Sequence, residues 1–378
     1  MKLSRALLLP LLLLTTAAPI GCGGGDTTGS SAGGTSNGGG GSAPTGGTGG
    51  STDTNPTGGT GATTTTTSDT GTTSTTDTGT TSTTSSSMDV LDPAKDGPYQ
   101  TTTKDGTFNA NNASVPVHAV YPTSGPEAGP YPVIVIAHGF QLPASQYYKY
   151  AERLATFGYV ALAVDFPTSL FSADNPGNAA QLVASLDWAK TNLAGIANSD
   201  LAGITGHSLG GKLSLLAVTL DPRFKASIVL DPVDGGGFSC SPPGCVDVSS
   251  LMPQINVPTG FLGETTDAMA QGFGQACAPS ADNFQTFYSG ASSPSFAVTI
   301  KGANHMSFLD DVASCGFTCN VCNMATLDNA TVNGMSRAFV VAFYERHLRN
   351  NTGYDTYLTG AKAQELYVTP GTATIESK

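Results

Sequence analysis

The order of apolar segments along residues 89–378 constrains the fold more than any other feature. Continuous apolar runs such as 131–137 (YPVIVIA) and 159–165 (YVALAVD) are typical of strands buried on both faces of a parallel sheet. Between them lie longer segments whose apolar residues recur at helical spacing. The alternation predicts an α/β fold, with a mostly parallel central sheet and helices on both faces. We expect strands at 115–121, 131–137, 159–165, 201–205, 224–230, 259–262 and 296–300, and helices at 145–157, 178–193, 209–219 and 335–348.

The first 88 residues have a different character. Residues 1–21 place Lys2 and Arg5 ahead of a short apolar run, which indicates an export signal. The run is shorter than the about 20 residues that cross a bilayer, and no later stretch is a better candidate. Cys22 follows in a context similar to the lipobox of bacterial lipoproteins, so we expect its acylation, with simple secretion as the alternative.

Residues 22–88 consist almost entirely of Gly, Thr and Ser, and such a segment cannot bury a core. We therefore expect a signal peptide at 1–21, a disordered linker at 22–88 and one folded domain at 89–378. The mature protein is expected at the cell surface or on the outer membrane as a lipoprotein, otherwise secreted, and as a monomer.

The net charge of −12 argues against nucleic acid and anionic membrane surfaces as partners. Membrane contact is expected only through the lipid at Cys22. An even number of further cysteines in an exported chain predicts up to three disulfides. One pair flanks a Ser-Pro-Pro-Gly turn that can close a small loop. The alternative is a metal site on the last three cysteines with Cys277, although their spacing matches no common zinc pattern. The six are Cys240, Cys245, Cys277, Cys315, Cys319 and Cys322.

The sequence offers a candidate nucleophile at residues 206–210, GHSLG, which fits the pattern G-x-S-x-G. Two further matches lie within 29–38, but only this one follows an apolar strand and opens an apolar helix. A serine on that turn has a strained backbone and an exposed hydroxyl, and side chains at Gly206 or Gly210 would collide with the adjoining elements. We expect Ser208 to be a nucleophile; the alternative is a serine in an ordinary glycine-rich turn.

A nucleophilic serine needs a general base, and His305 is the best placed of the five histidines. It follows a late strand, in a loop that can reach back over Ser208. The others are less suitable by position: His118 lies in an early strand, His138 precedes Gly139, His207 adjoins the nucleophile with its side chain directed elsewhere, and His347 lies far along the last helix.

Two carboxylates meet the requirements for the acid that orients the base, since each follows a strand and lies between Ser208 and His305 in the chain. Asp231 ends the strand SIVLD, and Asp267 follows the strand that begins at Thr259. Each also has a structural explanation. Asp231 can form an Asp-Pro turn, and Asp267 can cap a helix. The spacing alone leaves both open.

Four blocks of the sequence resemble the chlorophyllase group of α/β-hydrolases, which is related to platelet-activating-factor acetylhydrolases and dienelactone-hydrolase-like esterases. The blocks are HGFQLPASQYYKYAERLATFGYVALAVD, GHSLGGK, LDPVDG, and CAPSADNFQTFY leading into KGANHMSFLDD. The resemblance implies the α/β-hydrolase fold and a triad of Ser208, His305 and Asp231. The related cutinase and polyester-hydrolase branch uses the later acid, which corresponds here to Asp267.

The same resemblance implies an oxyanion hole of the Phe140 and Leu209 backbone N–H groups, and a substrate pocket bordered by Tyr147 and Tyr148. It implies hydrolysis of carboxylic esters through an acyl-enzyme, without a metal or organic cofactor. Leu209 stands where plant chlorophyllases carry Arg, so the resemblance extends to the fold and the ester chemistry but not to chlorophyll. We expect short- to medium-chain or lipid esters as substrates. The alternatives are a polyester hydrolase and a non-catalytic surface-binding module.

Overall fold

The structure is a computed structural model that describes residues 90–235 and 241–378. The predictions for the signal peptide, the acylation of Cys22 and the linker lie outside the described residues, and so does the prediction for Cys240. Among the helices of the described ranges, none combines the length and hydropathy that a bilayer span requires.

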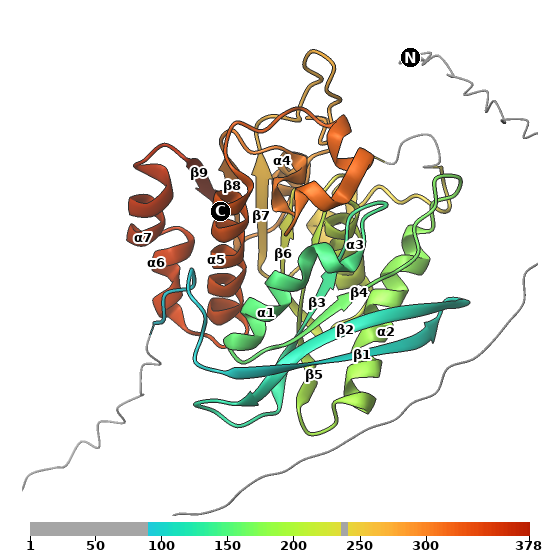
Figure 1. The fold of residues 1–378 in the computed structure, drawn as a ribbon, viewed down its shortest axis with the longest axis vertical. Coiled ribbons are helices and arrows are strands. Elements are labelled where there is room, and N and C mark those ends of the chain that lie inside the picture. The colour runs from blue at the N-terminus through green and yellow to red at the C-terminus, as the bar shows by residue number, and fades with distance from the viewer. Residues whose placement is uncertain (1–89, 236–240) are drawn as a thin grey trace, which may run out of the picture. The chain divides into compact units, whose positions relative to one another are not determined.

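The strands of the described chain form one sheet in the order β1-β2-β4-β3-β5-β6-β7-β8-β9 (Figure 1). The six strands from β4 to β8 in this order are parallel, whereas β1, β2 and β9 pair antiparallel at the two edges. The predicted mostly parallel sheet is therefore confirmed. The strands are β1 (Gln100–Ala110), β2 (Ala113–Ser124), β3 (Tyr131–Ala137), β4 (Val160–Val164), β5 (Ala197–His207), β6 (Phe224–Leu230), β7 (Thr259–Glu264), β8 (Ser295–Ile300) and β9 (Ala373–Ser377).

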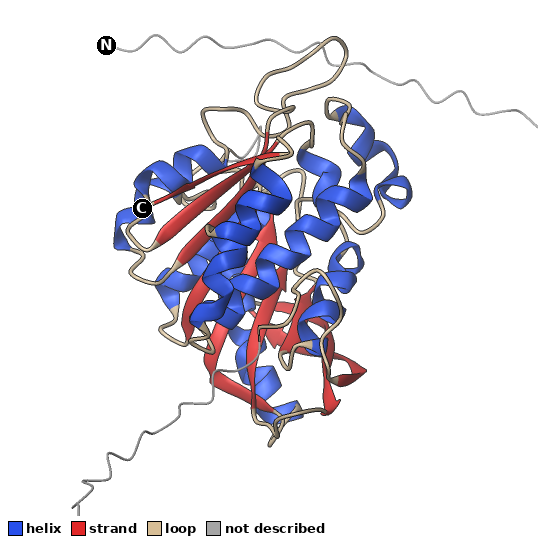
Figure 2. Ribbon diagram, turned by 90° about the vertical axis from the view of Figure 1, so that its left-hand side faces the viewer, coloured by secondary structure: helices blue, strands red, loops and turns tan. Residues whose placement is uncertain are grey.

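Helices cover both faces of the sheet (Figure 2). One face packs against α1 (Tyr148–Thr156) and α5 (Asn329–His347), and the other against α2 (Asn175–Asn192), α3 (Leu209–Leu220) and α4 (Phe284–Gly290). This arrangement confirms the α/β-hydrolase architecture. The remaining helical segments are η1 (Ala144–Tyr147), η3 (Ser249–Gln254), η4 (His305–Phe308), η5 (Val312–Val321), η6 (Thr352–Tyr354), α6 (Asp355–Leu358), α7 (Ala361–Ala363) and η7 (Gln364–Val368).

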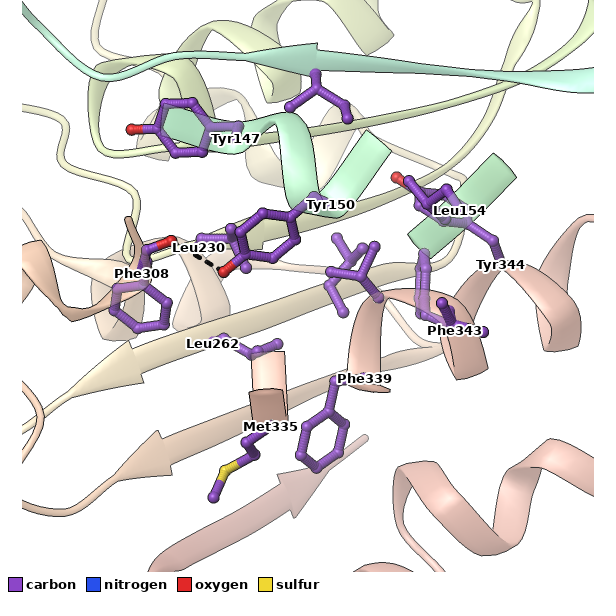
Figure 3. Packing of buried hydrophobic residues seen from close by; sticks show 14 of the residues in the cluster. Tyr147, Tyr150, Leu154, Leu230, Leu262, Phe308, Met335, Phe339, Phe343 and Tyr344 are labelled. Atoms are coloured by element: carbon purple, nitrogen blue, oxygen red, sulfur yellow. Dashed lines mark hydrogen bonds between the residues drawn. The ribbon is translucent and has the colours of Figure 1, made fainter. Parts of the chain in front are cut away.

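The core beneath α1 and α5 holds the ends of the central strands in place (Figure 3). Each fully buried aliphatic or aromatic side chain stabilises the folded state by roughly 1.5–3 kcal/mol relative to the same side chain exposed to water. The Tyr150 hydroxyl donates to the Phe308 carbonyl at 3.0 Å, so this aromatic residue is buried without an unpaired polar group. Leu230 and Leu262 anchor the ends of β6 and β7, from which the two candidate acids follow. Residues of this core include Tyr147, Tyr150, Leu154, Leu230, Leu262, Phe308, Met335, Phe339, Phe343 and Tyr344.

Two helices begin earlier than the apolar spacing predicts, because capping side chains determine their first turns. Helix α2 begins at Asn175 rather than 178, where the Asp174 carboxylate accepts from the Gly177 N–H at 2.9 Å. Helix α5 begins at Asn329 rather than 335, and Asp328 caps it by accepting from the Thr331 N–H at 2.9 Å.

Candidate active site

The candidate nucleophile lies at the sharp turn between β5 and α3. Ser208 has φ 58° and ψ −123°, a conformation that non-glycine residues rarely adopt. A Cβ added at Gly206 would overlap the Gly210 carbonyl, and one added at Gly210 would overlap the Ala137 carbonyl. The two glycines therefore allow β5, β3 and α3 to approach closely enough to form the turn that carries Ser208.

His305 connects Ser208 to one of the two candidate acids. Its Nε2 lies 2.8 Å from the Ser208 Oγ, and its Nδ1 lies 2.6 Å from the Asp231 Oδ2. Because a carboxylate only accepts hydrogen bonds, Nδ1 carries the proton and Nε2 is free to accept from the serine hydroxyl. His305 and Asp231 are buried, while Ser208 is partly exposed to the cavity beside it.

Asp267 supports the histidine from another side. Its Oδ2 accepts from the His305 backbone N–H at 2.8 Å, and its Oδ1 accepts from the Asn323 backbone N–H at 2.7 Å. It neither hydrogen-bonds the imidazole nor caps a helix. The structure thus brings both candidate acids to His305, with Asp231 at the ring and Asp267 at the backbone.

Burial of several ionisable groups sets the charge around His305. Burial raises the pKa of Asp231, and the charge of Asp267 raises it further. Burial and the charge of Asp231 raise the pKa of Glu264 to about 8. Burial lowers the pKa of His305 to about 4, against the opposing effect of the Glu264 and Asp267 carboxylates. The imidazole is therefore neutral at neutral pH, as a general base has to be.

Two backbone N–H groups next to Ser208 are available to bind an oxygen anion. Neither the Phe140 nor the Leu209 N–H has a hydrogen-bond acceptor within the described ranges. Leu209 is the first residue of α3, where helical N–H groups have no internal partner and the helix dipole favours negative charge. Both residues line the cavity that Ser208 and His305 also line.

A buried hydrogen-bond chain passes through Tyr147 and joins two loops of the site. One is the loop that follows β3 and contains Phe140 (the Phe140 loop), and the other follows β8 and leads into His305 (the His305 loop). The Gly139 N–H donates to the Tyr147 Oη at 3.2 Å, and this hydroxyl lies 2.8 Å from the His207 Nδ1. His207 Nε2 lies 2.8 Å from the His305 carbonyl, so Nε2 donates and Nδ1 accepts from the Tyr147 hydroxyl. The side chain of His207 thus points away from the Ser208 hydroxyl and connects two loops of the site.

The expectation that Tyr147 and Tyr148 border the substrate pocket is corrected by their positions. Tyr147 is fully buried and does not line the cavity at Ser208, because its hydroxyl is engaged in the chain to His207. Tyr148 stacks on His118 at 4.0 Å between ring centroids and lines a separate hollow. The cavity at Ser208 is instead lined by Phe140 and Leu209, the two residues predicted as oxyanion donors.

The cavity beside Ser208 has a volume of about 490 Å³ and extends to α2. Its α2 side is polar and presents the amide side chains of Asn175, Asn178 and Gln181. One cation also lines it. The buried Lys212 Nζ lies 3.2 Å from the Asp234 Oδ1 and donates to the Asp234 carbonyl at 2.7 Å, which neutralises its charge.

One disulfide links the segments that follow Asp267 and His305, and a second closes a short loop within η5. Cys277 pairs with Cys322, with their Cα atoms 5.5 Å apart, and Cys315 pairs with Cys319. All four cysteines of the alternative metal site are therefore oxidised and present no thiolate. Cys245 is also disulfide-bonded.

Sequence reasoning did not identify the amide face of α2 or the connecting role of Tyr147 and His207. The amides lie at 175, 178 and 181, which is the spacing of residues on one helix face, so the sequence pattern could have indicated this polar face. The Tyr147 contacts join residues distant in the chain, and no local pattern indicates them.

Comparisons with known proteins identify a family and several similar enzymes. The chlorophyllase family model matches residues 89–365. A bis(hydroxyethyl) terephthalate hydrolase of Streptomyces coelicolor is 30% identical over 50% of this chain and 54% of its own length. Chlorophyllase-1 of Arabidopsis thaliana is 27% identical over 53% and 66% of the two chains, and cutinase est1 of Thermobifida alba is 25% identical over 61% and 66%. The chain thus covers less than two thirds of the length of these relatives.

Proposed function

The chain belongs to the chlorophyllase family, and from that membership and the contacts of His305 we propose that it is an exported carboxylic ester hydrolase. The observation that carries the proposal is the pair of hydrogen bonds by which His305 connects the Ser208 Oγ with the Asp231 carboxylate. The three relatives named above are described as ester-cleaving enzymes, which supports the reaction class. The substrates that we propose are short- to medium-chain or lipid esters.

In the proposed mechanism the Ser208 Oγ attacks the ester carbonyl carbon while the His305 Nε2 takes the hydroxyl proton. Asp231 accepts from Nδ1 and stabilises the imidazolium that forms. The Phe140 and Leu209 N–H groups bind the oxyanion, and such a donor contributes roughly 3 kcal/mol in the transition state. His305 returns the proton to the leaving alcohol, and an acyl-Ser208 remains. Water activated by His305 then releases the acid.

A polyester or another insoluble ester is the second candidate, and one loop favours it. Ser169 and Ser172 line the cavity, and between them Leu170 and Phe171 are exposed, the Phe171 side chain at 92%. Large apolar side chains beside a cavity are a common means of contact with an apolar surface. Two of the relatives are described as a cutinase and a terephthalate ester hydrolase.

The decisive experiment is mass spectrometry of the protein after reaction with a fluorophosphonate, together with turnover of p-nitrophenyl esters. We expect one adduct on Ser208, and Ser208→Ala to abolish both adduct and turnover. Ser172→Ala, a serine lining the same cavity, is the control and retains both. Folded protein without adduct or turnover would instead support the non-catalytic binding module.

The two acids are separated by asparagine variants. We propose Asp231 as the triad acid and Asp267 as a residue that positions the His305 backbone. Asp231→Asn should lower kcat by about four orders of magnitude, because an amide favours the wrong imidazole tautomer. Asp267→Asn should mainly lower the melting temperature and affect kcat far less. Loss of turnover in Asp267→Asn alone would transfer the role of the acid to Asp267.

A further inference from the structure

The cavity beside Ser208 contains a polar face that the proposed ester chemistry does not require. Asn175, Asn178 and Gln181 are spaced along one side of α2, and all three line the cavity. An ester carbonyl needs only the nucleophile, the base and the oxyanion donors. A row of amides therefore indicates that another part of the substrate is bound there.

Two of these amides are buried without full hydrogen bonding. Gln181 is 1% exposed, and its Nε2 donates to the Ala110 carbonyl at 3.3 Å, while its Oε1 has no donor within the described ranges. Asn178 is 6% exposed, and its side chain makes no hydrogen bond with any described residue. A buried polar group left unpaired is unfavourable, so it calls for an explanation, and a partner that binds there provides one.

The charges nearby show which partner fits. Asp174 is occupied, because it accepts from the Gly177 N–H and from the Asn111 Nδ2 at 2.8 Å. Lys212 is neutralised by Asp234. The Asp174 carboxylate keeps its charge but is exposed to solvent, whereas the Asn178 and Gln181 side chains are buried, neutral and offer both donors and acceptors. A hydroxyl group is also neutral and both donates and accepts, so it matches these buried amides better than an ion, whose burial beside neutral groups would be costly.

We propose that Asn178 and Gln181 form a subsite for hydroxyl groups, and that the enzyme prefers esters in which one half is hydroxylated, as in esters of polyols, sugars or hydroxy acids. This inference rests on the proposed ester hydrolysis at Ser208. The Asn178 Nδ2 then donates to the hydroxyl oxygen, and the hydroxyl group donates its one O–H to the Gln181 Oε1. The amides determine specificity and take no part in the bond cleavage.

The test compares esters that differ only in hydroxyl groups. One pair is glycerol monobutyrate and propyl butyrate, and the other is p-nitrophenyl hexanoate and its ω-hydroxy analogue. We expect the hydroxylated member of at least one pair to have a kcat/KM higher by about tenfold, which corresponds to one good hydrogen bond. Turnover of p-nitrophenyl butyrate separates the two hypotheses. Its absence refutes the ester hydrolase itself, whereas its presence without any preference refutes only the subsite.

Variants assign the preference to the amides. Asn178→Leu keeps the number and branching of the side-chain heavy atoms while removing both polar groups, and it should abolish the preference while p-nitrophenyl butyrate turnover persists. Gln181→Met should do the same and provides a second variant if Asn178→Leu does not fold. Asn192→Ala, at the exposed far end of α2, is the control and should keep the preference. A preference that survives in both folded amide variants would overturn the proposal.

Discussion

Among individual residues, His305 depends most on its surroundings, because burial opposes its charge while the carboxyl groups of Glu264 and Asp267 favour it. Burial prevails and lowers the pKa of His305 to about 4, below the 6.5 of a free imidazole. A base acts only in its neutral form, so a lowered pKa moves the loss of activity toward lower pH. The imidazole therefore stays neutral well into the acidic range.

We accordingly expect the acid limb of kcat/KM for p-nitrophenyl butyrate to have its midpoint below pH 6.5. The midpoint belongs to the hydrogen-bonded pair of His305 and Asp231 rather than to either residue alone. Activity measured between pH 3.5 and 8, with the folded fraction followed by circular dichroism, tests this expectation. A midpoint above 6.5 in folded protein would show that the carboxylates outweigh burial.

At the scale of elements, the loops around Ser208 are held together by Tyr147. Tyr147→Phe removes the acceptor of the Gly139 N–H and the donor to His207. Because buried groups lose their partners, we expect a loss of about 1–3 kcal/mol in the free energy of unfolding. The Phe140 loop also loosens, so kcat should fall by about tenfold with little change in KM.

The matched control for Tyr147→Phe is Tyr150→Phe. Tyr150 is another buried tyrosine, and its hydroxyl contacts the Phe308 carbonyl rather than the Phe140 loop. The Tyr150→Phe variant should have a lower free energy of unfolding but an unchanged kcat. Equal losses of kcat in the two variants, measured by steady-state kinetics beside urea unfolding, would contradict a specific role for Tyr147.

The two disulfides should differ in their effect on stability. Cys277–Cys322 closes a loop with a sequence separation of 45, whereas Cys315–Cys319 has a separation of 4. A cross-link removes more entropy from the unfolded chain when it closes a longer loop. Replacing both cysteines of the first disulfide by Ser should therefore lower the free energy of unfolding by about 4 kcal/mol, and the same change at the second by about 2 kcal/mol. Urea unfolding of each variant measures both values, and the reverse order would contradict the expectation.

The sequence predicts those elements that are defined by the composition of their own residues rather than by contacts with distant parts of the chain. Strands β3 and β6 were predicted with their observed bounds, because β3 is a continuous apolar run and β6 is mostly apolar, as is typical of parallel strands buried on both faces. Strand β1 was not predicted, because it is an edge strand of exposed polar residues that is defined by pairing with β2. The contacts of Asp267 likewise depend on His305 and Asn323, which only the fold brings together.

At the scale of the whole molecule, the hydrophobic clusters of the described residues belong to one folded unit. Every described member of both clusters lies between Tyr99 and Ile375. The catalytic centre that we propose uses only residues from this range as well. The domain should therefore fold and act independently of the segment that precedes it.

Removing residues 1–88 should leave kcat/KM for a soluble p-nitrophenyl ester unchanged, because no proposed catalytic group is lost.

The full chain and its Cys22→Ser variant should differ in cell fractionation. If Cys22 is acylated, the full chain is expected in the membrane fraction and Cys22→Ser in the soluble fraction, since the lipid is the expected attachment. Cys22→Ser that stays with the membrane would contradict lipid anchoring. A truncated domain that is folded but inactive would show that the N-terminal segment contributes to the site.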